Sequence, residues 1–118
     1  MSMAFYAQAD VKIGVAAPFT GPNATYGAQY WKGASQAVAD INAAGGVLGR
    51  KLVGVVRDDA ASPPKSIQNM NELIDNEKVA AVVGPTNSGN ALAWLHIPQQ
   101  KKVPVVSHVA TATDITAR

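Results

Sequence analysis

The sequence predicts an open α/β fold, with a parallel sheet that carries helices on both of its faces. Short apolar runs alternate along the chain with longer stretches of helical periodicity, and no internal repeat interrupts this order. Strands separated by helices of this length pair in parallel through right-handed crossovers, because antiparallel neighbours are joined by short turns. The runs 80–83 and 103–106 are apolar at successive positions, which is typical of strands covered on both faces.

The composition limits the chain to one domain and excludes several classes of protein. Its 118 residues, 47% of them hydrophobic, are enough for one core and too few for two domains. The formal net charge of +2 is spread without blocks of like charge, so nucleic acid is not an expected partner. No apolar run approaches the roughly 20 residues of a membrane span. The absence of cysteine excludes disulfides, thiolate metal sites and a cysteine nucleophile.

The first predicted strand covers 11–19 and ends at Pro18, and the first helix follows over 25–46. Apolar residues recur along this helix at spacings of three and four, so one face is expected to pack on the sheet. They are Tyr30, Ala34, Ala37, Val38 and Ile41. Gly45 and Gly46 end the helix because glycine adopts left-handed conformations without steric cost.

The second predicted strand covers 51–59, and a loop at Pro63 and Pro64 separates it from a helix over 65–77. The periodicity of this helix predicts a buried stripe on one face. The stripe consists of Ile67, Met70, Leu73 and Ile74.

The last predicted elements are a strand over 79–84, a helix over 90–97 and a strand over 103–107. We expect Pro98 to end or kink the helix, since proline lacks the amide hydrogen that a helix interior requires. In open α/β sheets ligands bind outside the carboxyl ends of the strands, which selects four loops. These loops are 19–26, 58–64, 85–90 and 108–113.

Known catalytic and cofactor patterns are missing from these loops. There is no G-x-G-x-x-G, no phosphate-binding G-x-x-x-x-G-K-[ST] and no G-x-S-x-G. Asp58 and Asp59 have no histidine or third carboxylate nearby in the sequence to complete a metal site, so loop capping is their expected role. His96 is expected on the surface of a helix. His108 lies in a ligand-facing loop, where we expect its side chain to form hydrogen bonds as part of the wall of the site. We therefore expect no enzyme, no cofactor and no metal.

The loop after the third strand changes abruptly from apolar to polar side chains. Residues 86–89 are Thr-Asn-Ser-Gly, and they lead into a helix whose free amide groups and dipole favour an anion such as a carboxylate. Asn87 or Ser88 could equally cap that helix, and the two roles are compatible.

Taken together, the residues resemble a known family of receptors. T-G-P-x-x-x-Y-G, I-N-A-x-G-G-V-x-G-R-K-L and the Asp58-Asp59 pair occur in this order, followed by "VAAVVGPTNSGNA" and "VPVVSHVATATDITAR". This pattern resembles the N-terminal lobe of leucine/isoleucine/valine-binding proteins, the type I periplasmic solute receptors of ABC transporters. The resemblance covers residues 10–118 and implies capture of an amino acid, or a related small carboxylate or amide, for import.

The resemblance also assigns roles to particular residues. Ser88 and Thr111 are expected to hold the ligand carboxylate, with Thr111 also touching the ammonium group. The backbone carbonyl of Val109 would accept from the ammonium group, and Tyr26 would form an aromatic wall. Asn87 and His108 add polar surface where this sequence departs from a leucine receptor. They point to a more polar amino acid, an amide or an aromatic acid as ligand.

Receptors of this family are about three times longer, which implies that this chain is a truncated lobe without its second lobe. Residues 1–9 would then be the remnant of a signal peptide or a tag, with Ala7-Gln8-Ala9 resembling a cleavage site of an exported, periplasmic protein. The longer parent would deliver its ligand to an ABC permease. The isolated lobe is expected to form a homodimer through the edge of the fourth strand.

Two other interpretations of the function of this sequence remain open. A regulatory ligand-sensing domain, such as the core of a sugar-responsive repressor, has the same lobe architecture, although no helix-turn-helix precedes Val11. The second interpretation is that the chain is part of an enzyme with a Rossmann-like half. It would need a glycine-rich cofactor loop or an acid/base pair.

Overall fold

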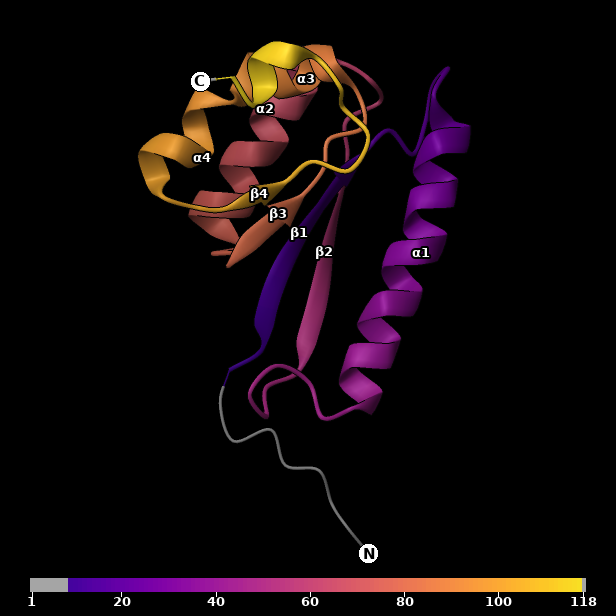
Figure 1. The fold of residues 1–118 in the computed structure, drawn as a ribbon, viewed down its shortest axis with the longest axis vertical. Helices are drawn as coiled ribbons and strands as arrows, with labels where there is room; N and C mark the ends of the chain where they lie inside the picture. The colour runs from indigo at the N-terminus through magenta and orange to yellow at the C-terminus, as the bar shows by residue number, and fades with distance from the viewer. Residues whose placement is uncertain (1–8, 118) are drawn as a thin grey trace, which may run out of the picture.

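The computed structural model describes residues 9–117 and has one four-stranded parallel sheet in the order β2-β1-β3-β4 (Figure 1). The strands are β1 (Val11–Ala17), β2 (Leu52–Asp58), β3 (Ala81–Val83) and β4 (Val105–Val106). All seven residues of β1 pair with β2 on one side, and three of them pair with β3 on the other. The predicted open parallel sheet is confirmed. Because the chain passes from β1 to one neighbour and later returns to the other, the loops after β1 and β3 diverge and leave a crevice between them.

Helices cover both faces of the sheet, as predicted (Figure 1). One face carries α1 (Ala24–Ala43). The other carries α2 (Pro63–Asn71) with the π-helical turn η1 (Glu72–Asn76), then α3 (Ser88–Trp94) and α4 (His96–Lys101), and the short 3-10 turn η2 (Thr113–Ile115) follows β4. Within residues 9–117, no helix has the length and apolar character needed to cross a lipid bilayer.

The core lies on the face of the sheet that carries α2, which we call the α2 face, between the strands and the helices of that face. Val82 of β3 and Ala16 of β1 project into it, and Met70, Leu73 and Trp94 meet them from the helices. The predicted stripe is confirmed at Met70, Leu73 and Ile74, which are buried, while Ile67 packs on the core at its margin. Among residues 9–117, most of the large buried apolar side chains belong to this core, and their burial stabilises the fold.

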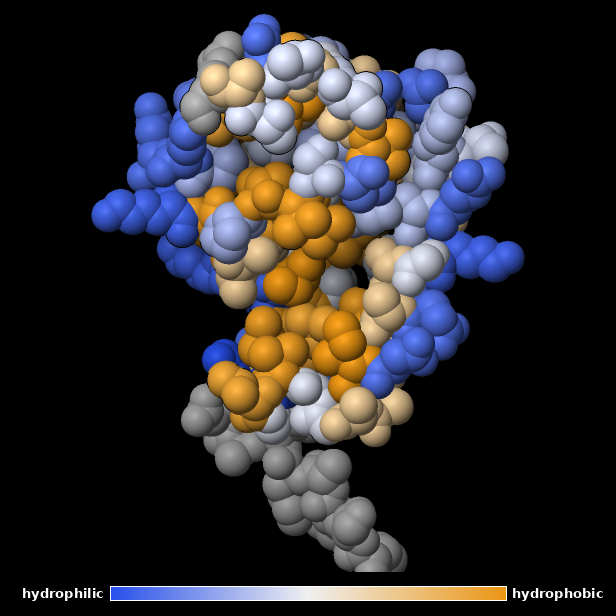
Figure 2. Space-filling model, viewed as in Figure 1, coloured by the Kyte–Doolittle hydropathy of each residue, from blue (hydrophilic) through white to orange (hydrophobic). Residues whose placement is uncertain are grey.

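The α1 face is less completely covered than the sequence predicted. The helix contacts β2 and β1, and its apolar stripe borders an open groove of about 580 Å³ beside β3 and β4. We call this the α1 groove; it is lined by Tyr30, Ala34, Ala37, Val38 and Ile41 of α1 and by Ile13, Val15, Ala81, Val83 and Val106 of the sheet. Figure 2 shows it as a continuous apolar surface along the molecule. Ile41 is therefore 40% exposed rather than buried.

Two of the differences from the predicted helix boundaries lie at prolines. Pro63 and Pro64 form the first turn of α2 rather than a loop, because the first turn of a helix has amide groups without intrahelical partners and tolerates proline. The predicted helix over 90–97 breaks at Leu95, and α4 continues past Pro98. Pro98 lies in the first turn of α4, where its missing amide hydrogen breaks no helical hydrogen bond. His96 is exposed at the start of α4, as predicted.

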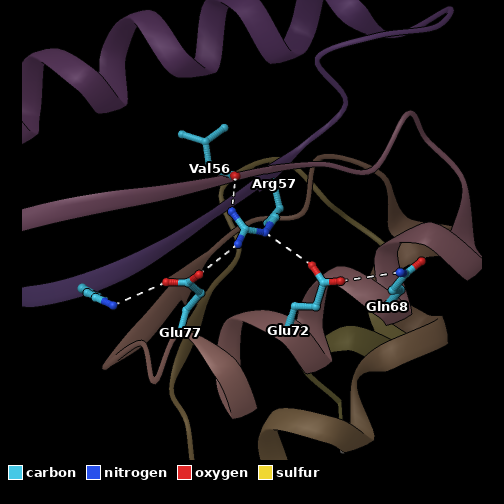
Figure 3. Close-up of polar contacts among 6 residues, drawn as sticks. Val56, Arg57, Gln68, Glu72 and Glu77 are labelled. Atoms are coloured by element: carbon cyan, nitrogen blue, oxygen red, sulfur yellow. Dashed lines mark hydrogen bonds and ion pairs between the residues drawn. The ribbon is translucent and has the colours of Figure 1, made fainter.

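The edge strand β2 is tied to η1 by a charged network. Figure 3 shows Arg57 lying between Glu72 and Glu77, with its Nε 3.5 Å from Glu72 and its Nη2 3.2 Å from Glu77. Lys12 of β1 also reaches Glu77, at 3.4 Å. Such half-exposed pairs contribute little stability individually, but charged side chains along an edge disfavour pairing with other chains.

Candidate ligand-binding site

The loop that follows β1 is held by the carboxylate at the end of β2. Asp58 accepts hydrogen bonds from the Phe19 amide at 2.8 Å, from the Thr20 hydroxyl at 2.6 Å and from the Ala60 amide at 2.9 Å. Burial would raise the pKa of Asp58, but the Thr20 hydroxyl and three backbone amides outweigh it and lower the pKa to about 2. The predicted loop-capping role of this aspartate is confirmed by its hydrogen bond from the Ala60 amide. It connects the loops after β1 and β2 through these hydrogen bonds.

Asp59, the next residue, is fully buried. Its Oδ1 accepts a hydrogen bond from the Ala61 amide at 2.8 Å, and burial raises its pKa. The part of the chain that the structure describes contains no group of histidine, cysteine, aspartate or glutamate side chains able to hold a metal ion. Both aspartates thus accept hydrogen bonds from backbone amides of the loop that follows β2.

A polar cavity of about 280 Å³ opens at the crevice between the loops after β1 and β3. It is lined by Asn23, Tyr26, Thr86, Asn87 and Val109. The Nδ2 of Asn87 donates to the Oδ1 of Asn23 at 3.2 Å, which connects the two loops across the crevice. Asn87 precedes α3 in the N-cap position, yet its side chain makes no hydrogen bond to the helix. Tyr26 and Val109 remain 57% and 43% exposed, so they form the open rim.

Ser88 begins α3 and contacts the loop that follows β4. Its Oγ accepts hydrogen bonds from the backbone amides of Thr111 at 3.1 Å and Ala112 at 3.2 Å. A serine hydroxyl has two acceptor positions and one hydrogen to donate. Both acceptor positions are used here by the chain itself, so the hydroxyl hydrogen is left to donate to another acceptor. Ser88 and Thr111, predicted as neighbours in the site, lie side by side.

His108 occupies a separate position at the end of the α1 groove. Its ring stacks on Tyr30 with centroids 4.2 Å apart, and the Tyr30 hydroxyl donates to the Val83 carbonyl at 3.0 Å. Burial raises the pKa of Tyr30 to about 12 and lowers the pKa of His108. The histidine is not among the five residues that line the polar cavity, although its loop neighbour Val109 is.

Two cavity residues were not predicted as site residues from the sequence. Thr86 lies in the polar run 86–89, and Asn23 lies within the T-G-P-x-x-x-Y-G pattern. Thr86 could have been found by its place directly after the third strand's Gly-Pro. The contribution of Asn23 depends on contact with a residue 64 positions away, which no local pattern reveals.

The family of the chain follows from comparison with known proteins. Residues 10–118 match the family model described as "Periplasmic binding protein". The chain belongs to this family. Among curated members, it is 42% identical to an amino acid binding protein of Pseudomonas aeruginosa over 118 residues, and 41% identical to a Leu/Ile/Val-binding protein of Rhizobium johnstonii over 119 residues. These alignments cover 100% and 99% of this chain but 32% of each relative, so the chain spans about a third of their length.

Solved periplasmic binding proteins have the same fold. The branched-chain amino acid transporter substrate-binding protein LivJ of Streptococcus pneumoniae, in complex with isoleucine, matches with a TM-score of 0.87 and 36% identity. A solute-binding protein of R. palustris in complex with 4-hydroxybenzoate matches with a TM-score of 0.83 and 32% identity. The matches cover 91% and 92% of this chain, and 31% and 29% of those structures. The fold expected from the resemblance is confirmed.

Membership of the periplasmic binding protein family agrees with the predicted periplasmic location. In the predicted cleavage site, Ala7 and Gln8 lie outside the described residues, and only Ala9 lies within them. Periplasmic binding proteins are substrate-binding proteins rather than enzymes, which agrees with the absence of catalytic motifs in the loops.

Proposed function

We propose that residues 10–118 form one ligand-binding lobe of an ABC-transporter receptor that captures a small carboxylate, and that residues 1–9 belong to an export leader or a tag. The proposal rests on the hydrogen bonds of the Ser88 hydroxyl. This hydroxyl accepts from two loop amides and keeps its hydrogen for a further acceptor, beside a polar cavity at the carboxyl edge of the sheet. A carboxylate is the acceptor that such a donor binds most strongly.

In this proposal the ligand lies across the crevice between the first and third strands. Ser88 donates to the carboxylate, and the exposed Thr111 hydroxyl adds a second donor from the facing loop. The carbonyl of Val109 accepts from the ammonium group of an amino acid, and Tyr26 covers the ligand from the rim. The second lobe of a longer receptor would close over the ligand and exclude water. The receptor would then deliver the ligand to its ABC permease.

The ligands of relatives support a carboxylate as the common feature. One solved relative is in complex with isoleucine and another with 4-hydroxybenzoate, while a Salmonella typhimurium relative is named as a Leu/Ile/Val/Thr-binding protein. Amino acids and hydroxybenzoates share little except a carboxylate. We propose that no chemistry follows binding, because the two groups bonded to the Ser88 hydroxyl are backbone amides and neither is a base.

Replacing Ser88 with alanine is expected to weaken carboxylate binding by about 1 to 3 kcal/mol, the range for a lost hydrogen bond to a charged group. The measurement is a titration of the 118-residue chain, followed by amide chemical shifts in two-dimensional NMR, with millimolar isoleucine, threonine, asparagine and 4-hydroxybenzoate. Ser35→Ala on the exposed side of α1 is the matched control, since Ser35 bonds only within its helix, at the Lys32 carbonyl. Equal affinities for the wild-type chain and Ser88→Ala would contradict the role given to this hydroxyl.

We also propose that the 118-residue chain associates with itself as a two-fold dimer. The strand β4 is an edge strand of the sheet, it pairs with β3 through Val105 and Val106, and Val106 is 58% exposed. A free edge beside an uncovered apolar surface favours pairing with another chain, and a second copy provides an equal edge and an equal α1 groove. Light scattering at micromolar concentration is expected to give twice the monomer mass of 12.2 kDa. A monomer at 100 μM would rule out this dimer.

A further inference from the structure

The cavity between the loops after β1 and β3 is lined mostly by residues with polar end groups. Four of its five lining residues, Asn23, Tyr26, Thr86 and Asn87, end in amide or hydroxyl groups. Branched-chain side chains offer no partner to such groups, whereas ligand pockets generally place polar groups where the ligand has a complementary one. The lining residues therefore indicate the chemistry of the ligand's side chain as well as that of its carboxylate.

Two of these polar groups have unused hydrogen-bonding capacity. Thr86 is 8% exposed, and its buried Oγ1 has no hydrogen-bond partner among residues 9–117. The Oδ1 of Asn87 is buried and also unpaired within the described part of the chain, because the amide of this residue uses its Nδ2 to reach Asn23. Buried polar atoms are nearly always paired in native proteins, and those that are not call for an explanation.

We infer that the cavity selects a carboxylate ligand whose side chain carries a hydroxyl or a primary amide, and that Thr86 and Asn87 determine this specificity. The inference rests on the proposed function, because Ser88 holds the carboxylate and directly follows Asn87 in the chain. Hydroxyl and amide groups both donate and accept, so they complement the Asn87 amide in either of its orientations. An aliphatic side chain of the same shape fills the cavity but leaves both buried atoms unpaired. A site with unpaired polar groups discriminates strongly against the ligand that lacks the partner.

The test uses pairs of ligands that match in shape and differ in one polar group. The pairs are threonine and valine, asparagine and leucine, and 4-hydroxybenzoate and 4-methylbenzoate. Dissociation constants for the 118-residue chain are measured by NMR titration. In at least one pair the polar member is expected to bind about tenfold more tightly, which corresponds to one recovered hydrogen bond.

A substitution then tests whether Thr86 is the source of the preference. Thr86→Val keeps the shape of the side chain and removes its hydroxyl, so the ratio of affinities within the preferred pair is expected to fall several-fold while the apolar member still binds. Thr86→Ser retains the hydroxyl and is expected to retain the ratio. Thr25→Val, at an exposed position of α1, is the matched control and should leave the ratio unchanged.

The outcomes separate this inference from the proposed function. Equal binding within all three pairs, or tighter binding of the apolar members, overturns the specificity but leaves carboxylate capture standing. An unchanged ratio in a folded Thr86→Val variant overturns the role of Thr86. If none of the six compounds binds, the proposed function fails and the specificity fails with it.

Discussion

Replacing Gly27 with alanine is expected to destabilise the chain by at least about 3 kcal/mol, at the upper end of the cost of overpacking a close contact. Gly27 is the buried residue of α1 and lies in the first turns of the helix, where they cross the end of β1. A Cβ atom at this position would overlap the Pro18 carbonyl oxygen, which is backbone and cannot rotate away. The start of α1 would have to move, and with it Asn23 and Tyr26 of the cavity.

A second glycine of the same helix provides the control. A Cβ at Gly33 would have no neighbour within 4 Å, so Gly33→Ala is expected to stabilise the chain by up to about 1 kcal/mol through helix propensity. Urea unfolding followed by circular dichroism gives both free energies. If Gly27→Ala matched Gly33→Ala in stability, α1 would not lie as close to β1 as the structure has it. Loss of ligand binding in Gly27→Ala, with binding retained in Gly33→Ala, would further link this contact to the site.

The sequence was sufficient to predict four strands paired in parallel, because alternation of strand and helix leaves few topologies open. It could not predict how completely the helices cover the sheet. The stripe from Tyr30 to Ile41 identifies the apolar side of α1, but periodicity is the same whether that side is packed or bordering the α1 groove. The prediction of a loop at Pro63 and Pro64 was wrong for a related reason. Proline breaks a helix interior yet favours its first turn, and only the position of the helix start distinguishes the two.

The location of the candidate site was likewise predictable, whereas its internal contacts were not. The rule that ligands bind at strand ends selected the loop with Asn87 and Ser88, and this loop lines the cavity or borders it. The hydrogen bond from Asn87 to Asn23 joins residues 64 positions apart in the sequence, and the hydrogen bond from the Thr111 amide to Ser88 joins residues 23 positions apart. Such contacts depend on side-chain rotamers and loop conformations, which local sequence patterns do not specify.

Replacing Trp94 with alanine is expected to destabilise the chain by about 4 kcal/mol, within the range measured for removing a large aromatic side chain from a core. Trp94 is 1% exposed and contributes to the core between α3 and the sheet. Its Nε1 donates to the Ser66 hydroxyl at 2.8 Å, which ties α3 to α2. Because α3 begins with Ser88, loss of this anchor is expected to loosen the helix that presents the proposed carboxylate donor.

Two further variants separate the volume of Trp94 from its hydrogen bond. Ser66→Ala keeps the indole in place but leaves its buried N–H unpaired, which is expected to cost about 1 to 3 kcal/mol. Trp31→Ala removes the other tryptophan, which is 36% exposed on α1 and packs beside Gly54, so its cost should be clearly smaller than that of Trp94→Ala. Urea unfolding of the three variants measures these differences. Equal destabilisation by the two tryptophan substitutions would show that the α2 face is not the main core, and that the surface bordering the α1 groove carries as much of the folding free energy.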